Sequence, residues 1–443
     1  MKPSAIYQFP RGFLWGTATS SHQVEGNNSN NNWSAWEQTP GKILNGDRSG
    51  LACDWWGGRW REDFDRAKES GQNAHRLSIE WSRIQPSPDR WDEEALDHYR
   101  QMIRGLVERG MTPLVTLHHF TDPLWVTEMG GWENGKTPEL FEVYARRVVE
   151  ALKEYVTLWI TINEPNVLAT MGYVIGDFPP GTPDMSLAFQ VMANLARGHA
   201  RAYHAIHEVK PEARVGIAVN YRGFQPKRSW WPFDRLVAWY SHRLFNEFFP
   251  QAFITGELKY IFRKVSLPQA KGTQDFLGLN YYTDELVAFD ITKASEGFAA
   301  RSFPPDADLS PTGFIANLPD AFFTSLKWAR KLQMPIIITE NGVEDQSDEM
   351  RPRYLANHIH QLWQAVNFSY GVKGYFHWSL VDNFEWDRGW SQRFGLWGLD
   401  VDTQTRQRRK SVDFYEAICK ANGLSTEMVS EYAPEAFDSI FPT

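Results

Sequence analysis

Short apolar runs alternate with longer amphipathic segments along nearly the whole chain, and this alternation constrains the fold more than any other feature. Eight runs rich in β-branched or apolar residues are typical of strands: 13–19, 74–79, 113–118, 157–162, 214–219, 275–281, 335–339 and 372–377. Eight segments with helical periodicity lie between or after them: 59–69, 93–108, 139–154, 187–209, 234–249, 318–332, 354–366 and 412–420. The pattern predicts an α/β fold, a closed (β/α)8 TIM barrel, and we expect residues 1–443 to form this single barrel domain.

Two segments depart from the alternation. An asparagine-rich cluster at 27–32 follows the first predicted strand, and residues 289–312 contain Phe-Pro-Pro and few periodic apolar positions. Both are expected to be loops, the second a long one between a strand and a helix. In a barrel such loops gather at the carboxyl ends of the strands, which is where active sites lie.

Charge and composition exclude several classes of partner. Lys and Arg number 46 against 54 Asp and Glu, so the net charge of −8 offers no basic surface for nucleic acid. The first residues lack the apolar core of a signal peptide and no run approaches the roughly 18 apolar residues of a membrane span, so we expect a cytoplasmic protein with no membrane partner. Cys53 and Cys419 have no zinc-site spacing and are expected to be free thiols. No metal or cofactor is expected, and the oligomeric state stays open.

Two glutamates stand at the carboxyl ends of predicted strands. Glu164 follows the fourth strand in Asn-Glu-Pro, and Glu340 ends the seventh in Thr-Glu-Asn-Gly. Cleavage of a glycosidic bond needs a proton for the leaving oxygen and a nucleophile or activated water at the anomeric carbon, and two carboxyl groups can supply both. The position alone leaves an alternative open, because a strand-end glutamate can equally be an ion-pair partner in the barrel rim. The 20 tryptophans add a weak indication of sugar stacking.

The sequence motifs around these glutamates and elsewhere in the chain weaken the ion-pair alternative. Besides the two motifs, residues 13–26 read Phe-Leu-Trp-Gly-Thr-Ala-Thr-Ser-Ser-His-Gln-Val-Glu-Gly, residues 377–386 read His-Trp-Ser-Leu-Val-Asp-Asn-Phe-Glu-Trp, and Arg-Phe-Gly-Leu follows at 393–396. In this order over the whole chain they resemble glycoside hydrolase family 1. The resemblance implies a retaining β-glycosidase of the β-glucosidase kind, which hydrolyses terminal non-reducing β-D-glucosyl residues of small saccharides.

The resemblance also implies catalytic roles. Glu164 matches the family's acid/base and Glu340 its nucleophile. Arg76, in His-Arg-Leu-Ser, matches the arginine that keeps the nucleophile charged, with a rim salt bridge as its alternative. Tyr282 matches the tyrosine whose hydroxyl binds the nucleophile, and Tyr281 would then be its neighbour in the core, although the motif does not separate the two.

A further set matches the family's contacts with the non-reducing sugar. Its members are polar or aromatic: Gln23, His119, Asn163, Trp378, Glu385, Trp386 and Phe394. Asn163 also supports the catalytic pair. Hydrogen-bonding side chains give specificity because a pocket built for hydroxyls leaves groups unpaired when the hydroxyls are missing. His118 precedes His119 on a strand and should therefore face the opposite side, in the core.

The region around Glu385 also indicates which class of sugar substrate to expect. Family members that act on 6-phosphorylated sugars carry Ser, Lys and Tyr there, whereas Glu385 would repel a phosphate dianion, so the resemblance implies a non-phosphorylated substrate. The intact Glu164 argues against the myrosinase-like branch, in which glutamine replaces it. Residues 387–390 and 311–314 depart from the usual family pattern and leave the aglycone preference open.

Two other functions stay open at this stage. One is a catalytically silent sugar-binding barrel of the klotho type, which the presence of both carboxylates disfavours. The other is an enzyme that mainly transfers the glycosyl group to an alcohol or sugar, because the loops that choose between water and sugar acceptors have no readable sequence signature.

Overall fold

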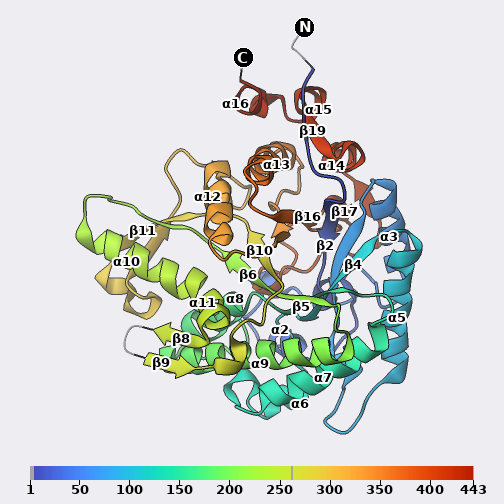
Figure 1. Cartoon of the computed structure of the whole chain (residues 1–443), viewed down its shortest axis with the longest axis vertical. Helices are drawn as coiled ribbons and strands as arrows, with labels where there is room; N and C mark the ends of the chain where they lie inside the picture. Colours follow the sequence, from blue (N-terminus) through green and yellow to red (C-terminus); the bar gives the residue numbers. More distant parts are fainter. Residues whose placement is uncertain (1–3, 261–262, 443) are drawn as a thin grey trace.

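Eight parallel strands close into a barrel at the centre of the computed structural model, which describes residues 4–260 and 263–442 (Figure 1). Around the barrel their order is β2 Leu14–Ala18, β3 Ala74–Ser78, β4 Thr112–His118, β5 Leu158–Asn163, β6 Arg214–Tyr221, β10 Phe276–Tyr281, β15 Ile336–Asn341 and β16 Val372–Trp378, and β16 pairs with β2. The predicted TIM barrel is confirmed.

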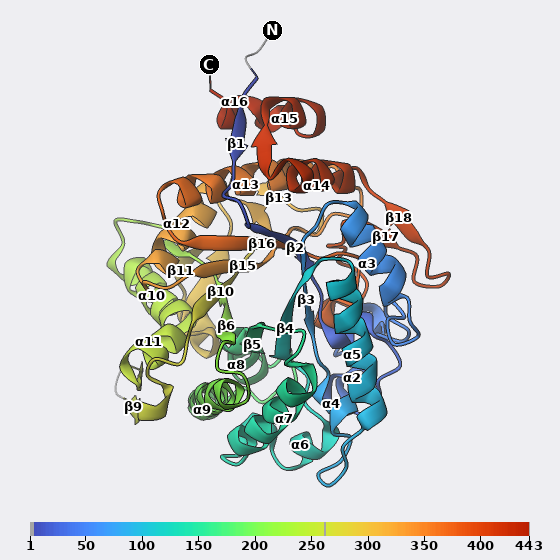
Figure 2. The ribbon, with the colours of Figure 1, turned by 45° about the vertical axis from the view of Figure 1, so that its right-hand side comes forward.

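Amphipathic helices surround the barrel (Figure 2). The longer ones are α3 Trp60–Glu69, α5 Glu93–Glu108, α7 Thr137–Leu152, α9 Met185–Val209, α10 Pro232–His242, α11 Phe248–Thr255, α12 Pro319–Arg330, α13 Arg351–Asn367 and α14 Lys410–Ala421. Their ends carry the expected signals: the Asp92 carboxylate accepts from the Ala95 amide at the start of α5, and Asn422 ends α14 in the left-handed conformation. The segment predicted as one helix over 234–249 is instead α10, a π-type turn over Arg243–Glu247, and α11.

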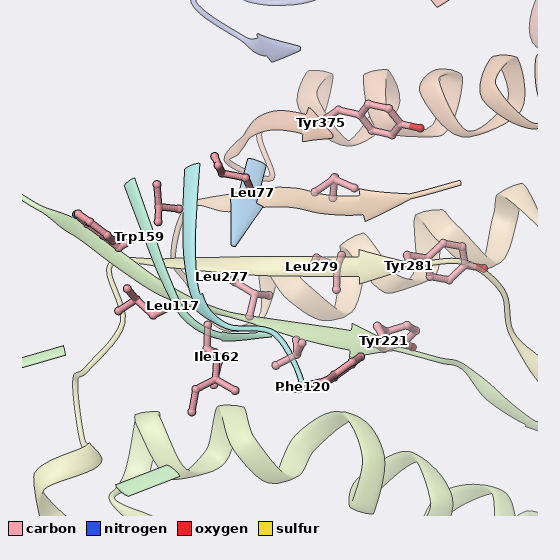
Figure 3. Packing of buried hydrophobic residues seen from close by; sticks show 14 of the residues in the cluster. Leu77, Leu117, Phe120, Trp159, Ile162, Tyr221, Leu277, Leu279, Tyr281 and Tyr375 are labelled. Atoms are coloured by element: carbon pink, nitrogen blue, oxygen red, sulfur yellow. The ribbon is translucent and has the colours of Figure 1, made fainter. Parts of the chain in front are cut away.

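Alternation along the strands produces two apolar layers. Leu277 and Leu279 of β10 point outward into the large cluster shared with the helices, with Tyr281 at the end of the same face, as Figure 3 shows. Phe276, on the opposite face, belongs to a second cluster inside the barrel together with Ala74, Leu114, Ile160, Ala218, Ile337 and Phe376. The barrel is therefore a packed core rather than a pore, and a ligand can enter only at its ends.

Smaller elements lie outside the barrel. The paired strands are β1 Ile6–Gln8 with β19 Gly423–Ser425, β8 Glu257–Tyr260 with β9 Arg263–Ser266, β13 Asp308–Leu309 with β14 Ala316–Asn317, and β17 Trp397–Leu399 with β18 Arg406–Arg408. The short helices are α1 Ser21–Val24, α2 Asn32–Glu37, α4 Trp81–Ile84, α6 Leu124–Glu128, α8 Pro165–Thr170, α15 Thr426–Tyr432 and α16 Phe437–Ile440. The β1–β19 pair brings both ends of the chain together (Figure 1).

Both segments predicted as loops contain ordered structure. In the asparagine-rich cluster, Asn31 caps α2 by accepting from the Ser34 amide. Residues 289–312 are not one long loop, because β12 Ala299–Ser302 pairs with β11 Glu285–Phe289, which in turn pairs with β7 Phe224–Pro226. This pairing joins residues far apart in the sequence, so local periodicity did not reveal it. Cys53 and Cys419 are buried free thiols, as predicted.

No helix among the described residues is long and apolar enough to cross a bilayer.

The carboxyl ends of three barrel strands are irregular. Register shifts interrupt the ladders between β5 and β6, between β10 and β15, and between β15 and β16. Bulges of this kind re-aim side chains next to functional sites. The strands that they affect carry Asn163, Asn280 and Glu340.

Candidate active site

Glu340 lies near the carboxyl end of β15, between two hydrogen-bond donors. Nη1 of Arg76, from β3, is 2.5 Å from Oε1, and the Tyr282 hydroxyl donates to Oε2 at 2.6 Å. Tyr281 takes the other side of the chain, packs in the core and donates to the Leu318 carbonyl at 3.4 Å. Two donors, one of them cationic, suit an ionised carboxylate.

Arg76 is fully buried, and its guanidinium is held on several sides. Nη2 donates to Oδ1 of Asn163 at 2.6 Å, Nη1 also donates to the Thr339 carbonyl at 3.1 Å, and Nε donates to the Thr116 hydroxyl at 3.1 Å. A buried charge that is paired and hydrogen-bonded in this way has a fixed geometry. Arg76 therefore fixes the position of Glu340.

The Thr-Glu-Asn-Gly motif also packs closely against the neighbouring strand. A Cβ atom at Gly342 would lie 2.0 Å from the carbonyl oxygen of Trp378, so only glycine fits there. This close approach places Glu340 beside the end of β16.

Glu164 occupies the junction between β5 and α8. Its backbone is left-handed, with φ of 43°, and its amide donates to the Ala218 carbonyl at 2.7 Å. Pro165 then begins α8, a position where its missing N–H does no harm. Such a strained backbone persists only where surrounding contacts hold it, and it turns the side chain toward Asn220 and Asn280, whose amides each donate to Oε1 at 2.8 Å.

Burial, and after it the nearby charge of Glu340, raise the pKa of Glu164 to about 7, while the amides of Asn220 and Asn280 act in the opposite direction. Glu164 can therefore hold a proton near neutral pH while Glu340 faces a guanidinium. A carboxyl group that can hold a proton, next to a second one that a cationic donor binds, suits the pair for the roles of acid and nucleophile.

Both glutamates open on one cavity of about 300 Å³. Its wall includes Tyr282 and most of the residues that the sequence placed around the sugar: His119, Trp378, Glu385, Trp386 and Phe394. The rings of His119 and Trp386 stack at 5.9 Å between centroids, and those of His119 and Trp378 at 6.0 Å. The cavity thus combines aromatic faces with polar groups, as a sugar site requires.

His119 is neutral, because burial and the Arg76 charge lower its pKa well below the usual value. Asn163 Oδ1 accepts from Arg76 and Asn280, so its amide nitrogen must be the atom that faces His119 Nε2, at 3.1 Å. Nε2 is then an acceptor and Nδ1 a donor, and Nδ1 has no partner among the described residues. His118, as predicted, lies in the core, with Nε2 at 3.0 Å from Asp122.

The family assignment rests on a match over nearly the whole chain. The model of the family described as Glycosyl hydrolase family 1 matches residues 6–424. The chain belongs to this family. It is therefore an enzyme, a glycosidase, as the sequence motifs indicated.

Named relatives of this family 1 glycosidase include β-glucosidases and β-galactosidases. β-Glucosidase A of Thermotoga maritima is 35% identical over 450 residues, which cover 95% of this chain and 99% of the relative. A β-galactosidase of Sulfolobus acidocaldarius is 30% identical, with 96% and 97% covered. The structure of a β-glycosidase from Pyrococcus horikoshii has a TM-score of 0.90 at 36% identity, covering 97% of this chain and 98% of that chain. A Thermotoga maritima β-glucosidase in complex with glucoimidazole has a TM-score of 0.89 at 34% identity, covering 94% and 100%.

Two of the residues expected to bind sugar lie behind the cavity wall of the glycosidase. Gln23, on α1, is fully buried and donates from Nε2 to Glu385 Oε2 at 3.2 Å and to the Phe384 carbonyl at 2.8 Å. Asn163 is fully buried between Arg76 and His119. Both residues position side chains that line the cavity, and their direct contact with sugar stays a prediction.

Asn220 and Asn280 are site residues of the glycosidase that the sequence reasoning did not name. They face each other in the β6–β10 ladder, and Asn280 also pairs with Glu340 across the β10–β15 ladder. Each ends a run of apolar residues at the carboxyl end of a barrel strand. A polar residue at that position was the available signal.

Proposed function

We propose that this glycosidase is a retaining enzyme that removes terminal non-reducing β-D-glucosyl residues from cellobiose, short β-glucosides and aryl β-glucosides, and that also accepts β-galactosides and β-fucosides. One observation carries the proposal: Glu340, held by Arg76 and Tyr282, shares a cavity with Glu164, whose pKa is raised to about 7. The names of the β-glucosidase and β-galactosidase relatives support the substrate class.

In the first step Glu340 attacks the anomeric carbon as the bond to the leaving oxygen breaks, and Glu164 gives its proton to that oxygen. The product is an ester between the sugar and Glu340. Forming this ester removes the negative charge of Glu340, and with it a cause of the raised pKa of Glu164. The pKa of Glu164 therefore falls when its role changes from acid to base.

In the second step Glu164 takes a proton from a water molecule, which attacks the anomeric carbon from the side that the leaving group vacated. Glu340 leaves as a carboxylate, and the two inversions give net retention. If an alcohol or sugar hydroxyl takes the place of water, the same step transfers the glycosyl group. Transglycosylation thus needs no further residue.

Glu385 is the residue that we assign to the 4- and 6-hydroxyls of the sugar. Burial and the charge of Glu340 raise its pKa well above the usual value, which favours its protonated form. A carboxyl group in either state can bond two neighbouring hydroxyls, equatorial or axial, which permits galactosides beside glucosides. A 6-phosphate would lie beside Glu385, which offers it no positive counter-charge, and should be rejected.

Replacing Glu385 by serine should lower kcat/KM for 4-nitrophenyl β-glucoside by about 10- to 100-fold, since one or two strong hydrogen bonds are lost. The matched β-fucoside has no 6-hydroxyl and should lose less. The measurement is kcat/KM of both enzymes on the nitrophenyl glucoside, galactoside, fucoside and 6-phosphoglucoside, with Glu385→Gln as the control that keeps the side-chain shape. Efficient cleavage of the phosphorylated substrate by the unaltered enzyme, or equal losses on glucoside and fucoside, would refute this role.

A further inference from the structure

Two arginines in the wall of the catalytic cavity flank one glutamate. Arg222 follows β6, and its Nη1 donates to Oε1 of Glu285 at 3.0 Å. Arg301 comes from β12, and its Nη1 is 3.7 Å from the other oxygen, Oε2. Arg222 and Arg301 both line the cavity, and we name them the arginine pair. One carboxylate thus faces two guanidinium groups.

The guanidinium N–H donors of Arg301 have no hydrogen-bond acceptor among the described residues. The other close contact of this side chain is the ring of Phe224, 5.4 Å from the guanidinium carbon. Burial lowers the pKa of Arg301, the charges of Glu285 and Glu296 act against this, and the charge of Arg222 adds to it. A partly buried guanidinium whose N–H donors lack close acceptors is a position where an anionic ligand gains interactions that water supplies poorly.

The third arginine that lines the cavity, Arg388, has a closer carboxylate partner than Arg301 has. Arg388 pairs with Asp387, with Nε 3.2 Å from Oδ2, and Asp177 lies close enough to raise the pKa of Asp387. Carboxylates there match or outnumber the cation. An anion entering the cavity is therefore drawn to the arginine pair.

The arginine pair lies on the side of the leaving group. Arg222 comes two residues after Asn220, which donates to the acid/base Glu164. Because Glu164 must reach the leaving oxygen, the aglycone extends from that oxygen along this part of the wall. Phe245 and Phe314 line the same cavity and offer faces for an aromatic ring.

We propose that the arginine pair binds a carboxylate on the aglycone, so that β-glucosides of hydroxybenzoate-like acids are preferred over their neutral counterparts. The inference rests on the proposed glycosidase function and adds the chemical class of the leaving group. Guanidinium groups suit this task because their planar donors match the two oxygens of a carboxylate.

The test compares 4-carboxyphenyl β-D-glucoside with its methyl ester, which has nearly the same shape and no charge. For each enzyme the ratio of the two kcat/KM values is measured, and the intrinsic difference between the leaving groups cancels when ratios of different variants are compared. Arg301→Gln should lower the ratio about tenfold, as expected for the loss of a charge-assisted contact, and Arg222→Gln should lower it in the same direction. Arg301→Lys should restore part of it.

Arg235→Gln is the matched control, because Arg235 is exposed on α10 outside the cavity and its replacement changes the net charge equally. Its ratio should stay at that of the unaltered enzyme. Activity on the ester shows that each variant is folded. An unchanged ratio in both Arg301→Gln and Arg222→Gln, or an equal fall in Arg235→Gln, would overturn this inference and leave the proposed glycosidase function standing. Failure of the unaltered enzyme to hydrolyse either substrate would overturn the proposed function and this inference with it.

Discussion

Replacing Glu340 by glycine should lower kcat/KM on 4-nitrophenyl β-glucoside by on the order of 10⁵-fold, because the group that attacks the anomeric carbon is gone. Glycine also leaves space beside Arg76 and Tyr282, which both lose their carboxylate partner. Azide or formate at high concentration should enter this space, restore turnover and give an α-configured product with azide, since only one inversion then occurs. The rates and the product anomer are followed together.

Loss of a buried ion-pair partner is destabilising, so the folded state of this variant must be checked. Arg76 keeps its contacts with Asn163, Thr339 and Thr116, and for this reason we expect the barrel to persist with a lower melting temperature. Rescue by azide is itself evidence of an intact pocket. Near-native hydrolysis without an added anion would show that Glu340 is not the nucleophile.

Replacing Glu164 by alanine should separate substrates according to their leaving groups. Cellobiose needs a proton on its leaving oxygen, and its kcat/KM should fall by about 10³- to 10⁴-fold. 2,4-Dinitrophenyl β-glucoside leaves readily without a proton and should lose far less in kcat/KM. Similar losses on both substrates would mean that Glu164 is not the acid.

The pH dependence gives a second readout of Glu164. Its pKa of about 7 means that the protonated form is present below this pH and is lost above it, so kcat/KM of the unaltered enzyme should fall as pH rises through about 7. For Glu164→Ala, kcat/KM on 2,4-dinitrophenyl β-glucoside should not show this fall, the alkaline limb of the pH profile. Asn220→Ala is the matched control: removing an amide that lowers the pKa of Glu164 should move the limb to higher pH rather than abolish it.

Local patterns were sufficient to predict the barrel, and they placed both glutamates of the proposed catalytic pair at its mouth. Alternating apolar and amphipathic segments require a parallel sheet covered by helices, and a glutamate at the carboxyl end of a strand can point only toward the mouth of the barrel. The family motifs then assigned Glu164 and Glu340 their roles, and strand alternation separated His119 from His118. These inferences depend on neighbours in the sequence.

Contacts between distant segments were not predictable in this way. The donors that hold Glu164 come from β6 and β10, so Asn220 and Asn280 become site residues only when the barrel closes. The pairing of β12 with β11 is equally non-local, and it is this pairing that brings Arg301 near Glu285. The placement of Gln23 behind Glu385 likewise follows from packing, because the motif specifies only that the two residues are neighbours of the sugar pocket.

The stereochemistry of the first product tests the central claim most directly. Proton NMR during the first minutes of hydrolysis of an aryl β-glucoside, faster than mutarotation, identifies the anomer that the enzyme releases. Double displacement through Glu340 and Glu164 predicts that β-glucose appears first and that α-glucose follows only as the sugar equilibrates. Initial release of α-glucose would show a single displacement by water and would contradict the account.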